Sequence, residues 1–396
     1  MKTKRIFSID IFRALTMLLM IFVNDLWTLK DIPLWLEHTE AEQDGMGLAD
    51  TVFPCFLFIL GMAIPFAIKN RIVKGDTPLQ LTKHIITRSI ALLIMGVFTV
   101  NVPEINETAT GMSSEVFQLL MVLGFFLIWN VYPKTEGLKG KIFLGLQALG
   151  VILLLILAYI FKAGPDNNII GMTPQWWGIL GLIGWTYLTA ALIYLFTYQK
   201  TYLLVFFTVL FNLFAIAGHA GLLQKIWSAG PSDWILANGA FFAFAFAGIM
   251  ASVLLEQYAS SENRQKLVGV YVIIGIVLLI LGFILRQYFI ISKILATPTW
   301  VLLCCGISFI FYALIYYVVD IKAKAHWFKS IKTAGTSTLT CYLIPYLYYS
   351  SANLSGIALP AFLTTGIVGL VKSLIYSFII IGIATLLGRI NVKLKI

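Results

Sequence analysis

The sequence predicts an all-α fold, a polytopic membrane helical bundle of about 11–12 transmembrane helices with both termini cytoplasmic. Hydrophobic residues make up 60 % of the 396 residues and charged residues 12 %, and the mean hydropathy is +0.91. This composition excludes an ordinary soluble domain and a disordered chain. The spacing of the apolar runs and the placement of the basic residues then give the number and the direction of the helices.

Twelve apolar runs are separated by polar breaks or by breaks that contain Gly and Pro. They fall near residues 6–29, 50–69, 81–101, 114–132, 141–162, 176–197, 200–220, 236–256, 267–289, 298–319, 333–350 and 362–388. A helix needs about 20 apolar residues to cross the hydrocarbon core, so each run is predicted to be one span. The weakest divisions are the short break at residues 198–201 and the run 333–350. The first run has no small-residue cleavage site after it, and we expect it to be retained.

The net charge of +10 indicates a membrane topology rather than a nucleic acid partner. With a cytoplasmic amino terminus, 21 of the 28 Lys and Arg residues fall in inner segments, five fall in outer segments, and Arg13 and Lys372 lie inside runs. Cytoplasmic loops carry such an excess of positive charge. The same topology places the loop that contains His38 outside. We expect one domain over residues 1–396, in a bacterial cytoplasmic membrane, in contact with lipid and able to form a homodimer.

The four cysteines do not form a pattern that predicts chemistry. Cys55, Cys304, Cys305 and Cys341 all lie in apolar runs, without the spacing of metal ligands or of a disulfide framework. We interpret them as small buried hydrophobic residues and expect no metal cofactor.

The stretch 35–66 leads from a polar loop with a histidine directly into an apolar run whose first turn carries Asp50. A histidine titrates near neutral pH and can carry protons or an acyl group, which makes His38 a catalytic candidate. A carboxylate at the mouth of a membrane helix is a functional-site hypothesis as well. In the simpler interpretation, His38 is a solvated loop residue and Asp50 only caps the helix.

Other polar residues lie near the ends of the predicted spans. Asp10 and Arg13 share a helical face and form either a structural ion pair or part of a site. His84 and Arg88, four residues apart at a cytoplasmic end, could contact a lipid phosphate or a nucleotide phosphate. Asn24 ends the first run on the outer side, as a helix-terminal residue or as a polar group of the site.

Several segments resemble the heparan-α-glucosaminide N-acetyltransferase family. The resemblance rests on 8–16, 22–24, His38, Gly45 and 48–61, and on a second set at 293–302, 317–320 and 335–342. It implies a multi-pass acyltransferase that takes an acetyl group from acetyl-CoA on the cytoplasmic side and delivers it to the amino group of a terminal glucosamine on the other side. The chain departs from the family pattern at Ala41, where tryptophan is usual, and after Gln118, where an arginine is usual.

The resemblance places the active histidine at His38, with Asn24 and Asp50 beside it. We therefore predict that these three residues are catalytic. We assign Arg13, Asp10, His84 and Arg88 to binding of the acetyl-CoA donor. The acceptor is expected to be an amino or hydroxyl group of a saccharide.

Two other functional classes fit the same sequence. A secondary transporter of sugars or amino sugars would also have about twelve spans and scattered charges within the membrane. A family member without catalysis would only bind a saccharide or a lipid. Within the enzyme hypothesis, His38 acts either as a general base or as a transiently acetylated carrier.

Overall fold

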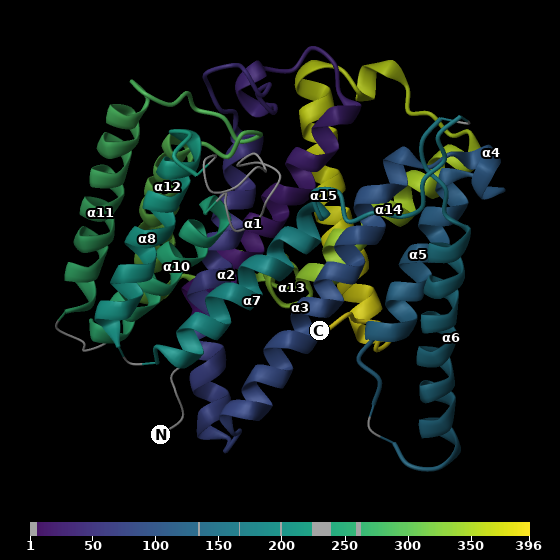
Figure 1. Cartoon of the computed structure of the whole chain (residues 1–396), viewed down its shortest axis with the longest axis horizontal. Coiled ribbons are helices and arrows are strands. Elements are labelled where there is room, and N and C mark those ends of the chain that lie inside the picture. Colours follow the sequence, from purple (N-terminus) through teal and green to yellow (C-terminus); the bar gives the residue numbers. More distant parts are fainter. Residues whose placement is uncertain (1–5, 134, 166, 199, 224–238, 259–262) are drawn as a thin grey trace. The chain divides into compact units, whose positions relative to one another are not determined.

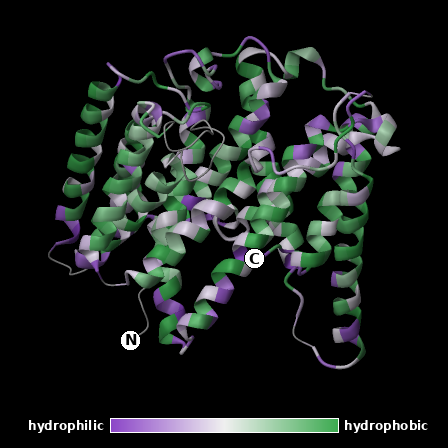
Figure 2. Ribbon diagram, viewed as in Figure 1, coloured by the Kyte–Doolittle hydropathy of each residue, from purple (hydrophilic) through white to green (hydrophobic). Residues whose placement is uncertain are grey.

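The computed structural model of the chain describes residues 6–396 except 134, 166, 199, 224–238 and 259–262 (Figure 1). The described residues contain 14 α-helices and, in place of strands, only isolated β-bridges. Ten of these helices are long and apolar enough to cross a membrane. Figure 2 shows hydrophobic residues along the helices and hydrophilic residues mainly in loops and at helix ends. The prediction of an all-α membrane bundle is confirmed.

Each of the twelve predicted runs contains a helix. These are α1 (Phe7–Asp25), α2 (Leu48–Val73), α3 (Pro78–Asn101), α5 (Ser114–Trp129), α6 (Leu138–Ile160), α7 (Gly178–Phe196), α8 (Thr201–His219), α10 (Ala240–Gln257), α11 (Arg264–Leu285), α12 (Pro298–Tyr316), α14 (Thr338–Ser355) and α15 (Gly366–Arg389). Two further helices, α4 (Glu107–Thr110) and α13 (Lys332–Thr336), are short. Residues 236–238, which begin one predicted run, lie outside the described residues.

Of the twelve helices that lie in the predicted runs, α5 and α14 are not among the ten candidate spans. Helix α5 has 16 residues, fewer than the other apolar helices. Helix α14 has 18 residues but carries many Thr, Ser and Tyr side chains, which lower its hydropathy. The short break predicted between two runs is present, because α7 ends at Phe196 and α8 begins at Thr201.

The helices pack as two compact units, each made of separate stretches of sequence. The first unit comprises residues 1–27, 31–86 and 185–335, and the second comprises 28–30, 87–184 and 336–396. The prediction of one functional domain over the whole chain stays a prediction.

Helix α2 is the central helix of the first unit and packs against α1, α10 and α12. Small residues allow the closest of these approaches. A Cβ atom on Gly61 would lie 1.9 Å from the carbonyl oxygen of Ala245 in α10, and one on Gly248 would lie 1.9 Å from that of Phe58. Helices in membranes associate through such close backbone packing. The position of α2 is thereby fixed.

The start of α1 is attached to the end of α12. The Asp320 carboxylate accepts hydrogen bonds from the backbone N–H groups of Phe7 (3.3 Å) and Ser8 (3.2 Å), and the Ser8 hydroxyl lies 3.0 Å from the Tyr312 hydroxyl. The two helices therefore run in opposite directions. The first unit has one end with the start of α1 and the end of α12, and an opposite end with the starts of α2 and α12.

The second unit is built around α5, which packs against α6 and α14. Residues 28–30 join it through paired backbone hydrogen bonds between Lys30 and the segment before α15 (2.8 and 2.9 Å). Within the apolar run of α15, the Lys372 ammonium donates a hydrogen bond of 3.0 Å to the Thr28 hydroxyl.

Candidate active site

At the start of α2, the buried carboxylate of Asp50 orients the partly exposed imidazole of His38. His38 lies in the loop before this helix, and its Nδ1 atom is 2.7 Å from Oδ1 of Asp50 in the first turn. A carboxylate can only accept a hydrogen bond, so Nδ1 carries the proton and donates it. In the neutral ring, Nε2 then keeps its lone pair. The His38 side chain is 48 % exposed and that of Asp50 only 1 %, so the imidazole is the accessible group of the pair.

The other oxygen of Asp50 is held by the backbone. Its Oδ2 atom accepts hydrogen bonds from the N–H groups of Thr39 (3.1 Å) and Gly47 (3.0 Å). Asp50 is thus the third residue of α2 and bonds the N–H of the residue just before the helix, as in a capping box. Its own carbonyl accepts a bond of 3.1 Å from the indole N–H of Trp300 in α12. The capping role expected for Asp50 and the orientation of His38 coexist in one side chain.

Gly47 allows the loop to reach the helix. A Cβ atom at this position would lie 1.9 Å from the carbonyl oxygen of Glu37 and 3.2 Å from that of Trp35. No side chain fits there unless the loop shifts. The absence of a side chain at Gly47 therefore lets the 35–38 segment lie against the start of α2, which brings His38 to Asp50.

Lys293 completes the cluster from the loop between α11 and α12. Its Nζ atom is 3.0 Å from Nδ1 and 3.4 Å from Nε2 of His38, and 3.7 Å from Oδ1 of Asp50. The Nδ1–H bond and the Nε2 lone pair point in diverging directions in the ring plane, so a group near both nitrogens lies against the face of the ring. Burial lowers the pKa of the Lys293 ammonium, and the Asp50 charge opposes this shift. The amino group of Lys293 is thus held beside the imidazole.

Asp44 joins the histidine loop to the segment that carries Lys293. Its carboxylate accepts a hydrogen bond of 2.8 Å from the N–H of Ile291 and one of 2.9 Å from Nε of Arg286. The Gly45 N–H in turn donates to the Ile291 carbonyl (3.0 Å). The Ile291 N–H, with a smaller contribution from Arg286, holds the pKa of Asp44 below its usual value. These bonds set the distance between Lys293 and the His38–Asp50 pair.

Sequence reasoning did not assign Lys293 to the site, although two signals pointed to it. Lys293 is one of the few basic residues in predicted outer segments, where His38 was also expected. It also begins the 293–302 segment that carried part of the family resemblance.

Within the described residues, the remaining predicted site residues make no hydrogen bond or ion pair to His38 or Asp50. Among the described residues, Asn24 makes no hydrogen bond to His38, and its position in the last turn of α1 is exposed. Nη1 of Arg13 lies 3.7 Å from the Asp10 carboxylate and donates a bond of 3.3 Å to the Gly335 carbonyl. These two residues lie near the start of α1, at the opposite end of the first unit from His38.

His84 and Arg88 lie in the first half of α3, where both are half-buried. Asp50 lies in the first turn of α2, whereas α3 follows the last turn of α2 in the chain. The 26 residues of α2 between them span about 39 Å. The residues predicted to bind the donor are therefore remote along the chain from the predicted catalytic pair.

The cysteines are buried free thiols, as expected. Within the described ranges, no group of three His, Cys, Asp or Glu side chains is placed to hold a metal ion.

Comparison with known proteins adds a family and several distant relatives. The sequence pattern described as "Domain of unknown function (DUF5009)" matches residues 5–258, which include His38 and Asp50. Heparan-alpha-glucosaminide N-acetyltransferase from Mus musculus is 34 % identical over 101 residues, which cover 24 % of this chain and 14 % of that protein. The Homo sapiens protein of the same name is 33 % identical over 101 residues, with the same coverage. The predicted resemblance is confirmed as a distant similarity over part of the chain.

A transporter matches over a similar length. An ammonium transporter from Mycobacterium bovis is 32 % identical over 94 residues, which cover 23 % of this chain and 19 % of the transporter. The matches to the acetyltransferases cover only 14 % of the length of those proteins.

Proposed function

The chain belongs to the DUF5009 family, a domain of unknown function, and we propose that it is an integral membrane acyltransferase with His38 at its reactive centre. The proposed donor is acetyl-CoA, and the proposed acceptor is an amino or hydroxyl group of a saccharide such as a terminal glucosamine. The distant similarity to N-acetyltransferases supports this reaction class. The observation that carries the proposal is the accessible imidazole held by a buried carboxylate.

In the direct route, Nε2 of His38 removes a proton from the acceptor as its nitrogen or oxygen attacks the thioester carbonyl. Asp50 keeps the proton on Nδ1 and stabilises the imidazolium that forms, as the carboxylate does in a catalytic triad. The new C–N or C–O bond forms, the C–S bond breaks, and the proton on Nε2 passes to the leaving thiolate. The Lys293 ammonium, beside the ring, stabilises negative charge on the carbonyl oxygen.

In the second route, Nε2 of His38 attacks the thioester itself and carries the acetyl group to the acceptor. The same tautomer serves both routes, because each uses the lone pair on Nε2. Steady-state kinetics separate them. An acyl-histidine predicts ping-pong kinetics and a labelled histidine in a rapid acid quench, whereas direct transfer predicts neither.

Binding of the acetyl-CoA donor by Asp10, Arg13, His84 and Arg88 remains part of the proposal. Asp10 and Arg13 form an ion pair in α1, and His84 and Arg88, both in α3, are the predicted phosphate contacts. If they hold the phosphates of acetyl-CoA, Arg88→Ala raises the KM for acetyl-CoA and leaves the KM for the acceptor unchanged.

Transport is the second candidate, favoured by the ten helices able to span a membrane and by the similarity to an ammonium transporter. The test uses full-length protein in lipid nanodiscs with radiolabelled acetyl-CoA and glucosamine. Release of free CoA together with labelled N-acetylglucosamine is the expected result. Accumulation of amino sugar or ammonium in proteoliposomes, without thioester loss, would replace the enzyme proposal with transport.

A further inference from the structure

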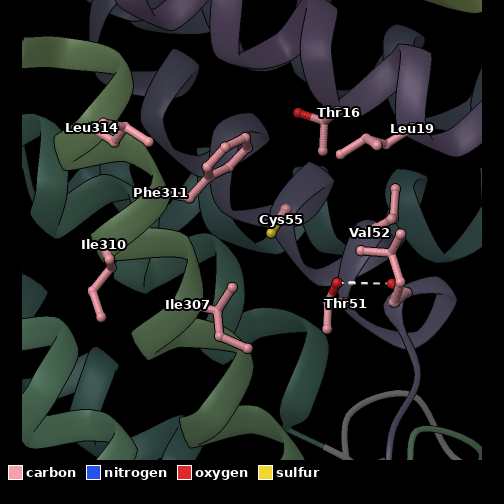
Figure 3. Close-up of a pocket in the computed structure, with 10 residues that line it drawn as sticks. Thr16, Leu19, Thr51, Val52, Cys55, Ile307, Ile310, Phe311 and Leu314 are labelled. Atoms are coloured by element: carbon pink, nitrogen blue, oxygen red, sulfur yellow. Dashed lines mark hydrogen bonds between the residues drawn. The ribbon is translucent and has the colours of Figure 1, made fainter. Parts of the chain in front are cut away.

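An apolar cavity of about 360 Å³ lies in the first unit beside the turn that carries Asp50. Figure 3 shows its walls, which come from α1, α2 and α12. The lining residues are Thr16, Leu19, Leu48, Thr51, Val52, Cys55, Ile307, Ile310, Phe311 and Leu314. Leu314, near the end of α12, is 55 % exposed, so part of the lining reaches the surface of the protein. All three walls are segments of helices able to span a membrane.

The polar groups in this cavity are already engaged. The Thr51 hydroxyl donates to the Leu48 carbonyl (2.8 Å), and the Thr16 hydroxyl donates to the Phe12 carbonyl. The Cys55 thiol lies 3.3 Å from the Ser308 hydroxyl oxygen, whose own proton is donated to the Cys304 carbonyl (2.7 Å). A guest with amides or hydroxyls, such as a pantetheine arm or a sugar, would lose hydrogen bonds to water and find no donor here. A hydrocarbon chain makes no hydrogen bonds to water and therefore loses none when it enters the cavity.

The cavity and the His38–Asp50 pair share the first turn of α2. Leu48 and Thr51 line one end of the cavity, and Asp50 lies between them in sequence. Along α2 the cavity extends from Leu48 to Cys55, which is about 10 Å of helix. A chain that fills it from the Asp50 end leaves the group attached to that chain at the level of the His38 loop.

We propose that this cavity binds the hydrocarbon chain of a membrane lipid, and that the head group of this lipid is the acyl acceptor. The second half of this statement rests on the proposed function. The acceptor class is then an amphiphile whose head bears an amino or hydroxyl group. A glycolipid and an aminophospholipid share this chemistry, and the assay separates them.

Lipid binding is tested with phosphatidylethanolamine that carries a photoreactive diazirine in its acyl chain, in nanodiscs with the full-length protein. Labelled peptides are mapped by mass spectrometry. We expect strong labelling of residues 48–55 and 307–314. Ile307→Trp fills the cavity and should reduce this labelling about fivefold or more, whereas Ile276→Trp, on an exposed face of α11, should not. Labelling spread over exposed helix faces and unchanged by Ile307→Trp would overturn the proposal.

The acceptor role is tested with glucosamine glycosides of increasing alkyl length, from methyl to dodecyl, and with phosphatidylethanolamine. Each methylene that enters an apolar site should lower the KM about fourfold until the cavity is full. Ile307→Trp should raise the KM for the dodecyl glycoside and leave that for the methyl glycoside unchanged. Equal KM values along the series would contradict the acceptor role, as would turnover of none of these lipids alongside turnover of a soluble acceptor.

The two proposals fail in different ways. His38→Ala should be photolabelled like the wild type, because His38 does not line the cavity. If the wild type shows no acyl transfer but the cavity is labelled and blocked by Ile307→Trp, the enzyme proposal fails and the lipid site stands. If acyl transfer depends on His38 but Ile307→Trp leaves the labelling of the cavity unchanged, only the lipid-site proposal is contradicted.

Discussion

Carboxylates lie at both ends of the first unit, and their partners differ. Asp50 and Asp320 each accept two backbone N–H hydrogen bonds at the start of a membrane helix, α2 and α1 respectively. Only Asp50 also bonds an imidazole, whose second nitrogen stays accessible. A carboxylate at a helix start, as at Asp320, is structural by default. It becomes part of a reactive site when one oxygen is left for a side chain that can exchange protons.

Replacement of aspartate by asparagine at Asp50 and at Asp320 is predicted to give the largest difference in transfer rate between the two ends of the first unit. Asp50→Asn removes the negative charge that fixes the proton on Nδ1 of His38, and transfer should fall about 10³-fold. The measurement is the initial rate of CoA release per folded molecule in nanodiscs. A decrease of less than tenfold would show that Asp50 serves only the helix, as Asp320 does.

Lys293→Gln should lower the rate about 100-fold, because it removes a preorganised cation beside the reacting centre. The ammonium is the active form, so activity falls as pH rises through the pKa of Lys293. Burial lowers this pKa from its ordinary value of 10.5, and the alkaline decline should come below that pH. Lys293→Arg, which stays charged, should move the decline upward. The same decline of activity at high pH in the wild type, Lys293→Gln and Lys293→Arg would exclude this role for Lys293.

Gly47→Ala should lower activity about tenfold or more and reduce the melting temperature, since its Cβ would collide with the Glu37 carbonyl and displace the histidine loop. Gly45→Ala is the matched control, because a Cβ there meets only the Thr39 methyl group at 3.7 Å. Rates and thermal unfolding are measured for both. Equal behaviour of the two variants would mean that the close approach at Gly47 does not position His38.

Asp320→Asn should affect stability alone. Loss of charge-assisted bonds to the start of α1 costs about 1 kcal/mol, and the rate per folded molecule should stay within twofold of the wild type. Thermal unfolding and CoA release measured on the same sample check both statements. A large loss of rate in this variant would remove the distinction between the two ends.

Much of the fold could be predicted from the sequence because hydropathy is a local property. Every predicted run holds a helix, and even the short break before Thr201 is real. The division into two units could not be predicted, because it depends on contacts between distant segments. The lower hydropathy of α14 follows from its Ser, Thr and Tyr content, which the simple counting of runs did not weigh.

The candidate site was predictable only where its parts are close in sequence. His38 and Asp50 are separated by a short loop, and both were named. Lys293 is held near them by contacts between distant segments, such as those of Asp44 with Arg286 and Ile291, which no local pattern encodes. Asn24 was placed beside the histidine by resemblance, and the structure gives it no hydrogen bond to His38 within the described residues.

The most direct test of the central claim is the rate of thiol release from acetyl-CoA by His38→Ala relative to the wild type. His326→Ala is the matched control, since this exposed histidine lies in a separate segment, the 3-10 helix Ala325–Ile331. We predict that His38→Ala loses transfer by at least about 10³-fold while its unfolding temperature and its cavity labelling are retained. Turnover of His38→Ala close to that of His326→Ala would contradict the account.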